Sequence, residues 1–152
     1  MMKHAAYILC IGAFIALAVG CVEGSKHDTA FRKAAEEIAA RDTWPPSPEN
    51  VSEAFWEARY AKDYPEMEIL WPGSAGTVNW ADVSASDDPD VRYVFGAART
   101  FTTERNAEVV QEAEVPYAAE KHFQDAGDYN LTMRLRALDT PHGPRWYVYS
   151  GN

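Results

Sequence analysis

The chain has 152 residues, with 23 acidic and 14 basic side chains, a net charge of −9 and two cysteines. This length accommodates one domain with a buried core, and its 47% hydrophobic and 12% aromatic content is too high for a disordered chain. The acidic balance argues against a nucleic-acid partner, which requires a basic patch to displace counterions from phosphates. The cysteine count excludes a disulfide scaffold and a Cys-rich zinc site.

The first 20 residues differ from the rest of the chain. Lys3 is their one fixed charge, and residues 5–19 form an uninterrupted apolar run. A charged start, an apolar stretch of roughly 7–15 residues and a small residue at the end are typical of a secretory signal. The run is slightly shorter than the about 20 residues of a spanning helix.

The apolar run ends in Ala18-Val19-Gly20-Cys21, which resembles the lipobox of bacterial lipoproteins. The resemblance implies cleavage before Cys21 and a diacylglyceryl thioether on its sulfur. We therefore expect a lipoprotein signal peptide at 1–20, the lipidated Cys21 with a short tether at 21–27, and a single domain at 28–152. An ordinary signal peptide and an uncleaved anchor are the alternatives. Val22 replaces the aspartate that favours inner-membrane retention, so the resemblance implies the outer membrane, facing the periplasm.

Helical patterns dominate the first half of the mature chain. Apolar residues at three- and four-residue spacing predict a helix over 28–41. Ser47-Pro48 is a cap followed by a proline in the first turn, which predicts a second helix reaching residue 61. Shorter helices are expected at 66–70 and 77–83. A loop is the alternative at 77–83, so the first half is predicted to consist of helices separated by breaks.

The period changes after the acidic stretch at 87–90. Apolar and polar residues alternate over 91–95, 107–117, 129–139 and 145–150, with turn residues at 125–128 and 141–144. This alternation predicts antiparallel strands of a sheet that is covered on one face. Helices followed by strands predict an α+β domain.

The segment 47–58, followed by Lys62-Asp63-Tyr64, and the terminal Trp146-Tyr147-Val148 resemble the nuclear-transport-factor-2-like (cystatin-like) superfamily. The resemblance covers about 47–151. It implies N-terminal helices packed in the concave face of a strongly curved antiparallel sheet of about four strands, which makes a cone with a pocket. Its enzymes use an acid or base deep in the cone, but none of their motifs matches here, so no catalytic residue is predicted.

Aromatic residues are the candidates for a pocket lining. Such pockets are mostly apolar with a few polar anchors, and the candidates are Trp56, Tyr60, Trp71, Trp80, Phe95 and Tyr147, with Gln111 as a polar anchor. The alternative is that these aromatic residues form the core of a small domain and that Gln111 is a satisfied amide.

Two further groups have simpler interpretations than a site. His122 lies beside a turn, where an exposed side chain is expected rather than a general base. The aspartates between 82 and 90 lack the spacing of a calcium loop and indicate a solvated turn. No metal and no cofactor other than the lipid on Cys21 is predicted.

Two hypotheses of function follow. The first is a membrane-tethered lipoprotein of the cell envelope, a non-catalytic binding or interaction module that contacts an envelope protein or forms a homodimer through the sheet. The alternative is a protein that binds a small molecule in the cone pocket, including an isomerase- or dehydratase-like enzyme. An open cavity with a buried acid, base or tyrosine would favour the alternative.

Overall fold

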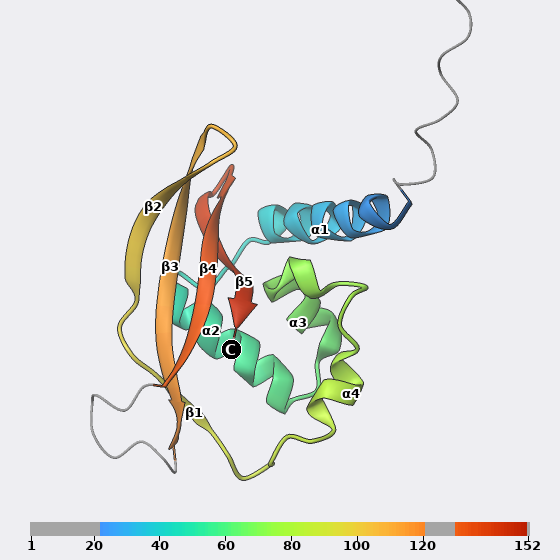
Figure 1. The fold of residues 1–152 in the computed structure, drawn as a ribbon, viewed down its shortest axis with the longest axis vertical. Coiled ribbons are helices and arrows are strands. Elements are labelled where there is room, and N and C mark those ends of the chain that lie inside the picture. Colours follow the sequence, from blue (N-terminus) through green and yellow to red (C-terminus); the bar gives the residue numbers. More distant parts are fainter. Residues whose placement is uncertain (1–21, 121–129, 152) are drawn as a thin grey trace, which may run out of the picture.

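The computed structural model describes residues 22–120 and 130–151, in which helices precede strands (Figure 1). The helical elements are α1 (Val22–Ala40), α2 (Pro48–Tyr60), α3 (Tyr64–Leu70), a 3-10 turn (Pro72–Ser74) and α4 (Trp80–Ser84). The strands are β1 (Tyr93–Phe95), β2 (Arg99–Arg105), β3 (Glu108–Ala119), β4 (Leu131–Thr140) and β5 (Gly143–Gly151). The predicted α+β class is confirmed.

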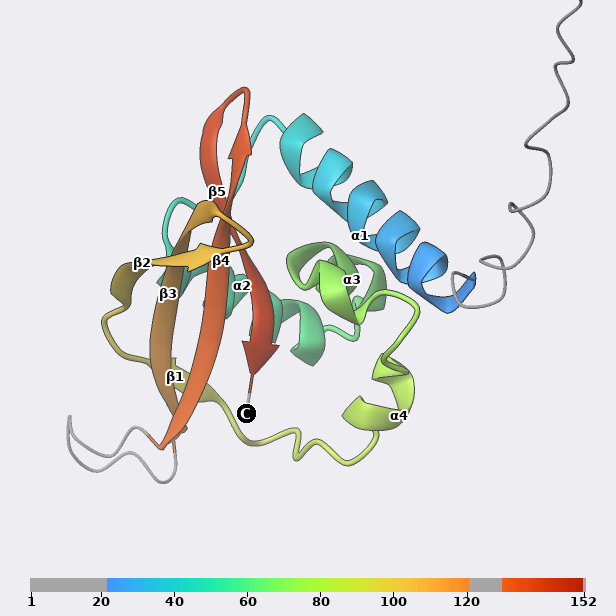
Figure 2. The ribbon, with the colours of Figure 1, turned by 45° about the horizontal axis from the view of Figure 1, so that its top comes forward.

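The strands form one antiparallel, strongly curled sheet that wraps around α2 (Figures 1 and 2). Its order is β1-β3-β4-β5, and β2 also pairs with β3. Because β1 lies opposite 117–119 and β2 opposite 108–114 of β3, the two share one edge. The sheet is therefore four strands wide, which confirms the predicted curved sheet of about four strands.

Strand β2 was not predicted from the sequence. Its residues alternate poorly, because Phe101 is the one large apolar side chain between Arg99 and Arg105. The strand is instead held in place by a hairpin to β3, whose two-residue turn is Asn106-Ala107 with φ angles of 52° and 65°. Two positive φ angles are the geometry of a type I′ turn, which matches the twist of the flanking strands.

The helix starts follow from local capping, with one exception. The Ser47 hydroxyl accepts the amide of Asn50 at 3.2 Å ahead of α2, and the Asp63 carboxylate accepts that of Glu66 at 3.2 Å ahead of α3. Helix α1, however, begins at Val22 instead of at residue 28. The segment 22–27, predicted as a short tether, is thus part of a 19-residue helix, about 28 Å long at 1.5 Å per residue.

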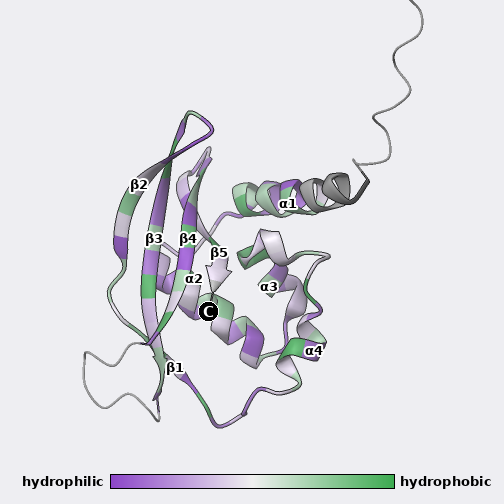
Figure 3. Ribbon diagram, in the orientation of Figure 1, coloured by the Kyte–Doolittle hydropathy of each residue, from purple (hydrophilic) through white to green (hydrophobic). Residues whose placement is uncertain are grey.

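The core lies between α2 and the inner face of the sheet. Alternate residues of β3 and β4 are fully buried against Val51 and Phe55 of α2; they are Ala113, Val115, Tyr117, Met133 and Leu135. Figure 3 shows the corresponding alternation of hydrophilic and hydrophobic residues along β3 and β4. The intervening side chains form the outer face, away from α2.

Helix α1 packs beside β5 and α3 rather than under the sheet (Figure 2). Phe31 meets the ring of Tyr147 edge-on at 5.8 Å between centroids, and the Arg145 guanidinium donates to the carbonyl of Ile38. A two-pronged pair between Arg41 and Glu66, 2.7 Å at each prong, connects the end of α1 to α3. Among the described residues, no helix has the length and apolar content needed to cross a membrane.

Candidate functional site

A cleft opens between α2, α4 and the end of the sheet at which β1 lies. It consists of an inner hollow of about 440 Å³, bounded by α2, α4 and strands β1, β3 and β4, and an outer hollow of about 410 Å³, bounded by α2 and the segment 84–93. Both hollows are lined by Trp56, Arg59 and Tyr93. We call the two hollows together the aromatic cleft.

Trp56 stands where the two hollows meet. Its ring lies against that of Tyr93, tilted by 34° with 4.1 Å between centroids, and it contacts Tyr117 at 5.9 Å. Trp56 is only 7% exposed, yet its indole Nε1 has no hydrogen-bond partner within the described part of the chain. A buried donor without a partner is uncommon, because losing its bond to water costs about 1–3 kcal/mol.

Arg59 is fixed at the mouth of the cleft. Its guanidinium lies 4.7 Å from the ring centroid of Trp56 and 5.9 Å from that of Trp80. The Nε and Nη2 groups each donate to the carboxylate of Asp87 at 2.6 Å. This pair closes the end of α2 onto the segment that follows α4. It also neutralises the charge of Arg59, so the mouth presents a planar, stacked surface rather than a bare cation.

On the helical side, Phe55, Trp71 and Trp80 contact one another with centroids 5.5–5.7 Å apart. The Trp80 indole donates to the Ser74 hydroxyl at 3.1 Å, and that hydroxyl donates to the carbonyl of Trp71 at 2.7 Å. Ser84, which lines the outer hollow, contrasts with Ser74: its buried hydroxyl has no partner among the described residues. Two residues that line the outer hollow, Trp56 and Ser84, thus each carry a buried polar atom without a partner among the described residues.

Two tyrosines of the cleft, Tyr60 and Tyr117, have raised pKa values. Burial, reinforced by the neighbouring Tyr93 phenol, raises the pKa of Tyr117 to about 12, although Arg59 works in the opposite direction. Burial also raises the pKa of Tyr60, whose hydroxyl accepts the amide of Tyr93 at 3.0 Å. A phenol with a raised pKa keeps its proton and does not serve as a base.

Four of the seven residues predicted to line a pocket lie in the aromatic cleft: Trp56 in both hollows, Tyr60 in the outer one, and Trp71 and Trp80 in the inner one. Three lie elsewhere. Phe95 stacks on Tyr117 at 5.8 Å without lining either hollow. Tyr147 faces α1 because its position in β5 points outward. Gln111 is exposed because its part of β3 pairs with β2 beyond the helices.

Sequence reasoning missed Arg59, Ser84, Tyr93 and Tyr117. Arg59 had a usable signal, since it follows Trp56 by three residues, and side chains three apart share a helix face. Tyr93 and Tyr117 had none, because only the pairing of β1 with β3 brings them together, with centroids 5.6 Å apart. Cys21 and His122 lie outside the described residues. Within 22–120 and 130–151 no group of three or more acidic, His or Cys side chains is arranged to hold a metal.

The residues that line the cleft therefore include several aromatic side chains, and two of them, Trp56 and Ser84, carry a buried polar atom without a partner among the described residues. This combination suits a flat, largely apolar ligand that carries a hydrogen-bond acceptor, because small-molecule sites are mostly apolar with a few placed polar groups. Comparisons of the chain with protein-family models, with curated proteins and with solved structures give no match.

Proposed function

We propose that the mature protein is a lipid-anchored, non-catalytic binding module of the bacterial cell envelope, and that the aromatic cleft holds its ligand. The ligand is a flat, mainly apolar small molecule with at least one hydrogen-bond acceptor. Its rings contact Tyr93 and the Arg59 guanidinium, and its acceptor takes the indole proton of Trp56.

The unpartnered polar atoms of the outer hollow carry this proposal. Aromatic side chains alone are equally consistent with a filled core. Trp56 Nε1 and Ser84 Oγ are both buried, without partners among the described residues, and their side chains line the same hollow. A ligand that bonds to both would remove a cost that the free protein otherwise bears.

The sequence Ala18-Val19-Gly20-Cys21 supports the anchor. Two or three acyl chains on one cysteine hold a protein stably at a bilayer. Helix α1, which starts at Val22, would then connect the anchor to the domain against which it packs. The net negative charge of the chain opposes attraction to anionic headgroups, which leaves the lipid as the attachment.

The enzyme alternative requires an acid or base that faces the ligand. Tyr117 is the most buried titratable side chain that lines the inner hollow. With a pKa raised to about 12 it is suited to orienting a ligand as a donor. Asp87 lines the outer hollow but is engaged by Arg59. Both features favour binding over proton transfer.

The cleft is tested with 8-anilinonaphthalene-1-sulfonate, a flat aromatic probe, added to the full chain in one fixed detergent. Emission is excited directly in the probe, and a micelle blank is subtracted. We expect Trp56→Phe, which keeps the ring and removes the donor, and Ser84→Ala to weaken binding roughly three- to tenfold each, the effect of one hydrogen bond.

Trp146→Phe is the matched control, since Trp146 is partly buried against the core and lines neither hollow. Its probe affinity should equal that of the unchanged chain. Equal affinity for all four proteins, or no emission above the micelle blank, would contradict a ligand site in the cleft.

The anchor is tested independently by Cys21→Ala. We expect the unchanged chain to fractionate with membranes and to lose residues 1–20, whereas the variant keeps them because the processing cysteine is absent. Identical processing and fractionation of the two chains would refute lipidation without bearing on the cleft.

A further inference from the structure

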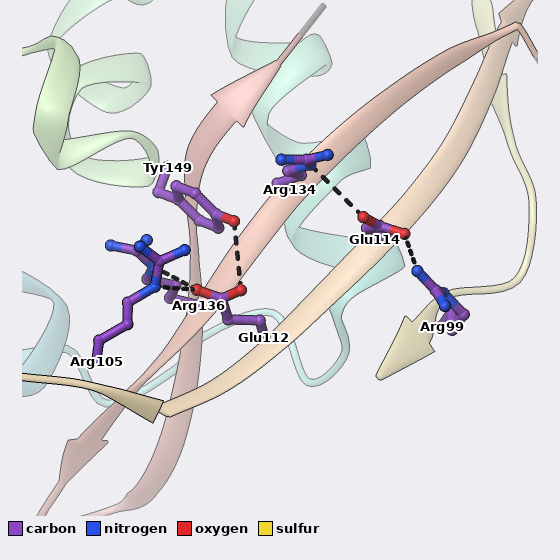
Figure 4. A network of polar contacts seen from close by, with 7 residues as sticks. All are labelled: Arg99, Arg105, Glu112, Glu114, Arg134, Arg136 and Tyr149. Carbon is purple, nitrogen blue, oxygen red and sulfur yellow. Dashed lines mark hydrogen bonds and ion pairs between the residues drawn. The ribbon is translucent and has the colours of Figure 1, made fainter. Parts of the chain in front are cut away.

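The outer face of the sheet carries a second organised cluster of polar residues (Figure 4). Glu114 on β3 lies between Arg99 of β2 and Arg134 of β4, at 2.6 Å and 3.6 Å. The cluster consists of Tyr149 and six charged residues, which are Arg99, Arg105, Glu112, Glu114, Arg134 and Arg136. We call this set the arginine face.

Within the arginine face, Arg99 and Arg134 surround Glu114, and a second row of residues surrounds Glu112. Its carboxylate, only 2% exposed, accepts from Arg105 at 3.1 Å and from Arg136 at 2.9 Å, with the Tyr149 hydroxyl at 3.5 Å. The Arg136 guanidinium also covers the Tyr149 ring at 3.8 Å. Both oxygens of the Glu112 carboxylate thus have partners within the arginine face.

Charge is distributed unevenly over the molecule. The arginine face holds four guanidinium groups against two carboxylates, in a chain whose net charge is −9. Glu108 lies opposite Arg105 at the hairpin end and offsets part of the surplus there. The excess positive charge is therefore concentrated around Glu114, where one carboxylate is shared by two guanidiniums.

Arg99 and Arg134 are the accessible members of the face. Their side chains are 74% and 55% exposed. Each is paired with Glu114 through a single nitrogen, whereas a guanidinium has five N–H donors in a planar fork. The remaining donors have no partner among the described residues and point into solvent, where they are able to grip a carboxylate with two prongs.

Apolar groups accompany these arginines. The Arg99 guanidinium lies 5.2 Å from the Phe101 ring centroid, and Val110 and Leu138 are half-buried at positions of β3 and β4 that point to the same side. Arginine and aromatic residues with aliphatic neighbours are the composition enriched in protein–protein interfaces. A polyanion without apolar groups would leave these side chains uncovered.

Two other occupants fit less well. A second copy that docked through the same face would bring two surfaces of surplus positive charge together, which like-charge repulsion disfavours. A membrane bound through the proposed anchor would lie on the wrong side: Figures 1 and 2 both show α1 extending away from the sheet, with the start of the helix on the side opposite to the outer face. An anchor next to Val22 therefore leaves the arginine face directed away from the bilayer.

We propose that the arginine face binds an acidic, amphipathic segment of a partner protein, whose carboxylates pair with Arg99 and Arg134 and whose apolar side chains cover Phe101. Glu114 acts as a built-in competitor that holds the two guanidiniums until the partner's carboxylates arrive. This binding is separate from that of the aromatic cleft, which lies on the other side of the sheet.

The test measures binding of a fluorescent peptide of alternating glutamate and leucine residues to the full chain. We expect Arg99→Gln combined with Arg134→Gln to weaken binding at least tenfold, about the effect of two charged hydrogen bonds, with affinity of the unchanged chain falling as salt rises. Arg32→Gln, an exposed arginine on α1, is the matched control and should leave affinity unchanged.

Glu114→Gln provides a second, opposite signature. Because it removes the competing carboxylate, we expect it to strengthen peptide binding several-fold, which an unfolded protein would not do. Unchanged affinity in both the arginine double variant and Glu114→Gln would overturn the proposal. So would binding of anionic vesicles or polyphosphate in preference to the peptide, or a homodimer that the double variant dissociates.

Discussion

The inner and outer faces of the sheet use alternate residues of the same two strands. Toward α2, β3 and β4 present Val115 and Leu135, both fully buried, whereas the intervening Glu112 and Arg136 form the network of the outer face. On the inner side the polar atoms near the cleft include two buried groups without partners. On the outer side the most buried carboxylate, Glu112, is bonded by two guanidiniums, and one buried hydroxyl, that of Thr103 on β2, also has no partner among the described residues.

This contrast distinguishes stability from binding. Buried polar groups are nearly always paired in a folded protein, and Glu112 follows that rule. Trp56 and Ser84 depart from it in a hollow large enough for a ligand. Positions where a polar group is left without a partner are where a fold is expected to serve function instead of stability.

The largest expected effect comes from the inner face. Leu135→Ala should lower the free energy of unfolding by about 3 kcal/mol, because it removes a fully buried side chain and leaves a cavity. Leu138→Ala, three residues further along β4 and half-buried, is the matched comparison and should cost about 1 kcal/mol. Urea denaturation measures both; equal losses would mean that the two faces contribute alike to the core.

The next effect concerns the outer network. Glu112→Gln should lower the free energy of unfolding by about 2 kcal/mol, because it leaves two guanidiniums without their buried counter-charge. Glu108→Gln, exposed on the same strand and face, should change stability by less than about 0.5 kcal/mol. A Glu112 variant as stable as the Glu108 variant would show that the network contributes nothing.

The same residue predicts a dependence on pH. Burial would raise the pKa of Glu112, but the hydrogen bond from Arg136 and the charges of Arg105 and Arg136 outweigh it and hold the pKa below its ordinary value of 4.5. A carboxyl with a lowered folded-state pKa contributes stability that is present above that ordinary value and is lost as pH falls through the folded-state pKa. Denaturation curves between neutral and acidic pH should thus converge for the unchanged chain and Glu112→Gln below this range. Parallel curves would contradict the assignment.

A smaller effect, of opposite sign, is expected at the β2–β3 turn. Ala107 has a φ angle of 65°, a left-handed conformation that costs a residue with a Cβ about 1 kcal/mol or more. Ala107→Gly should therefore raise the free energy of unfolding by roughly 0.5–1 kcal/mol. Ala85→Gly, at a φ angle of −63°, should lower it instead. Thermal unfolding of the two variants measures the signs; a loss at both positions would refute the strain at Ala107.

The smallest effect is expected in the cleft. Ser84→Ala should leave the free energy of unfolding unchanged or raise it, because it removes a buried hydroxyl that has no partner among the described residues. Ser74→Ala should cost about 1 kcal/mol, since its hydroxyl bonds to Trp80 and to the carbonyl of Trp71. A clear loss at Ser84 would mean that its hydroxyl is structural.

Sequence patterns sufficed where a local rule determines the structure. The Ser47-Pro48 start of α2 and the alternation in β3, β4 and β5 needed only neighbouring residues. They did not suffice for β2, whose position depends on its hairpin, nor for the start of α1, where polar residues 22–27 continue the helix. Residues with no local pattern are placed by tertiary pairing.

In the cleft, too, some residues were predictable from local sequence and others were not. Trp56 and Tyr60 were predictable because large aromatic residues on a helix opposite a curved sheet face its interior. Gln111 was misplaced, because alternation assigns it to a face but does not say where along β3 the helices end. The arginine face was missed because its arginines come from β2 and β4 and converge on β3 only through strand register.

The central claim is that the protein is a lipid-anchored module that holds a small ligand. Native mass spectrometry of the protein extracted from membranes tests this claim most directly. We predict a chain that begins at an acylated Cys21 and carries a small molecule that stays bound in the unchanged protein and is depleted in the combined Trp56→Phe, Ser84→Ala variant. A chain without acyl mass, together with no adduct or an adduct equally abundant in the variant, would contradict the account.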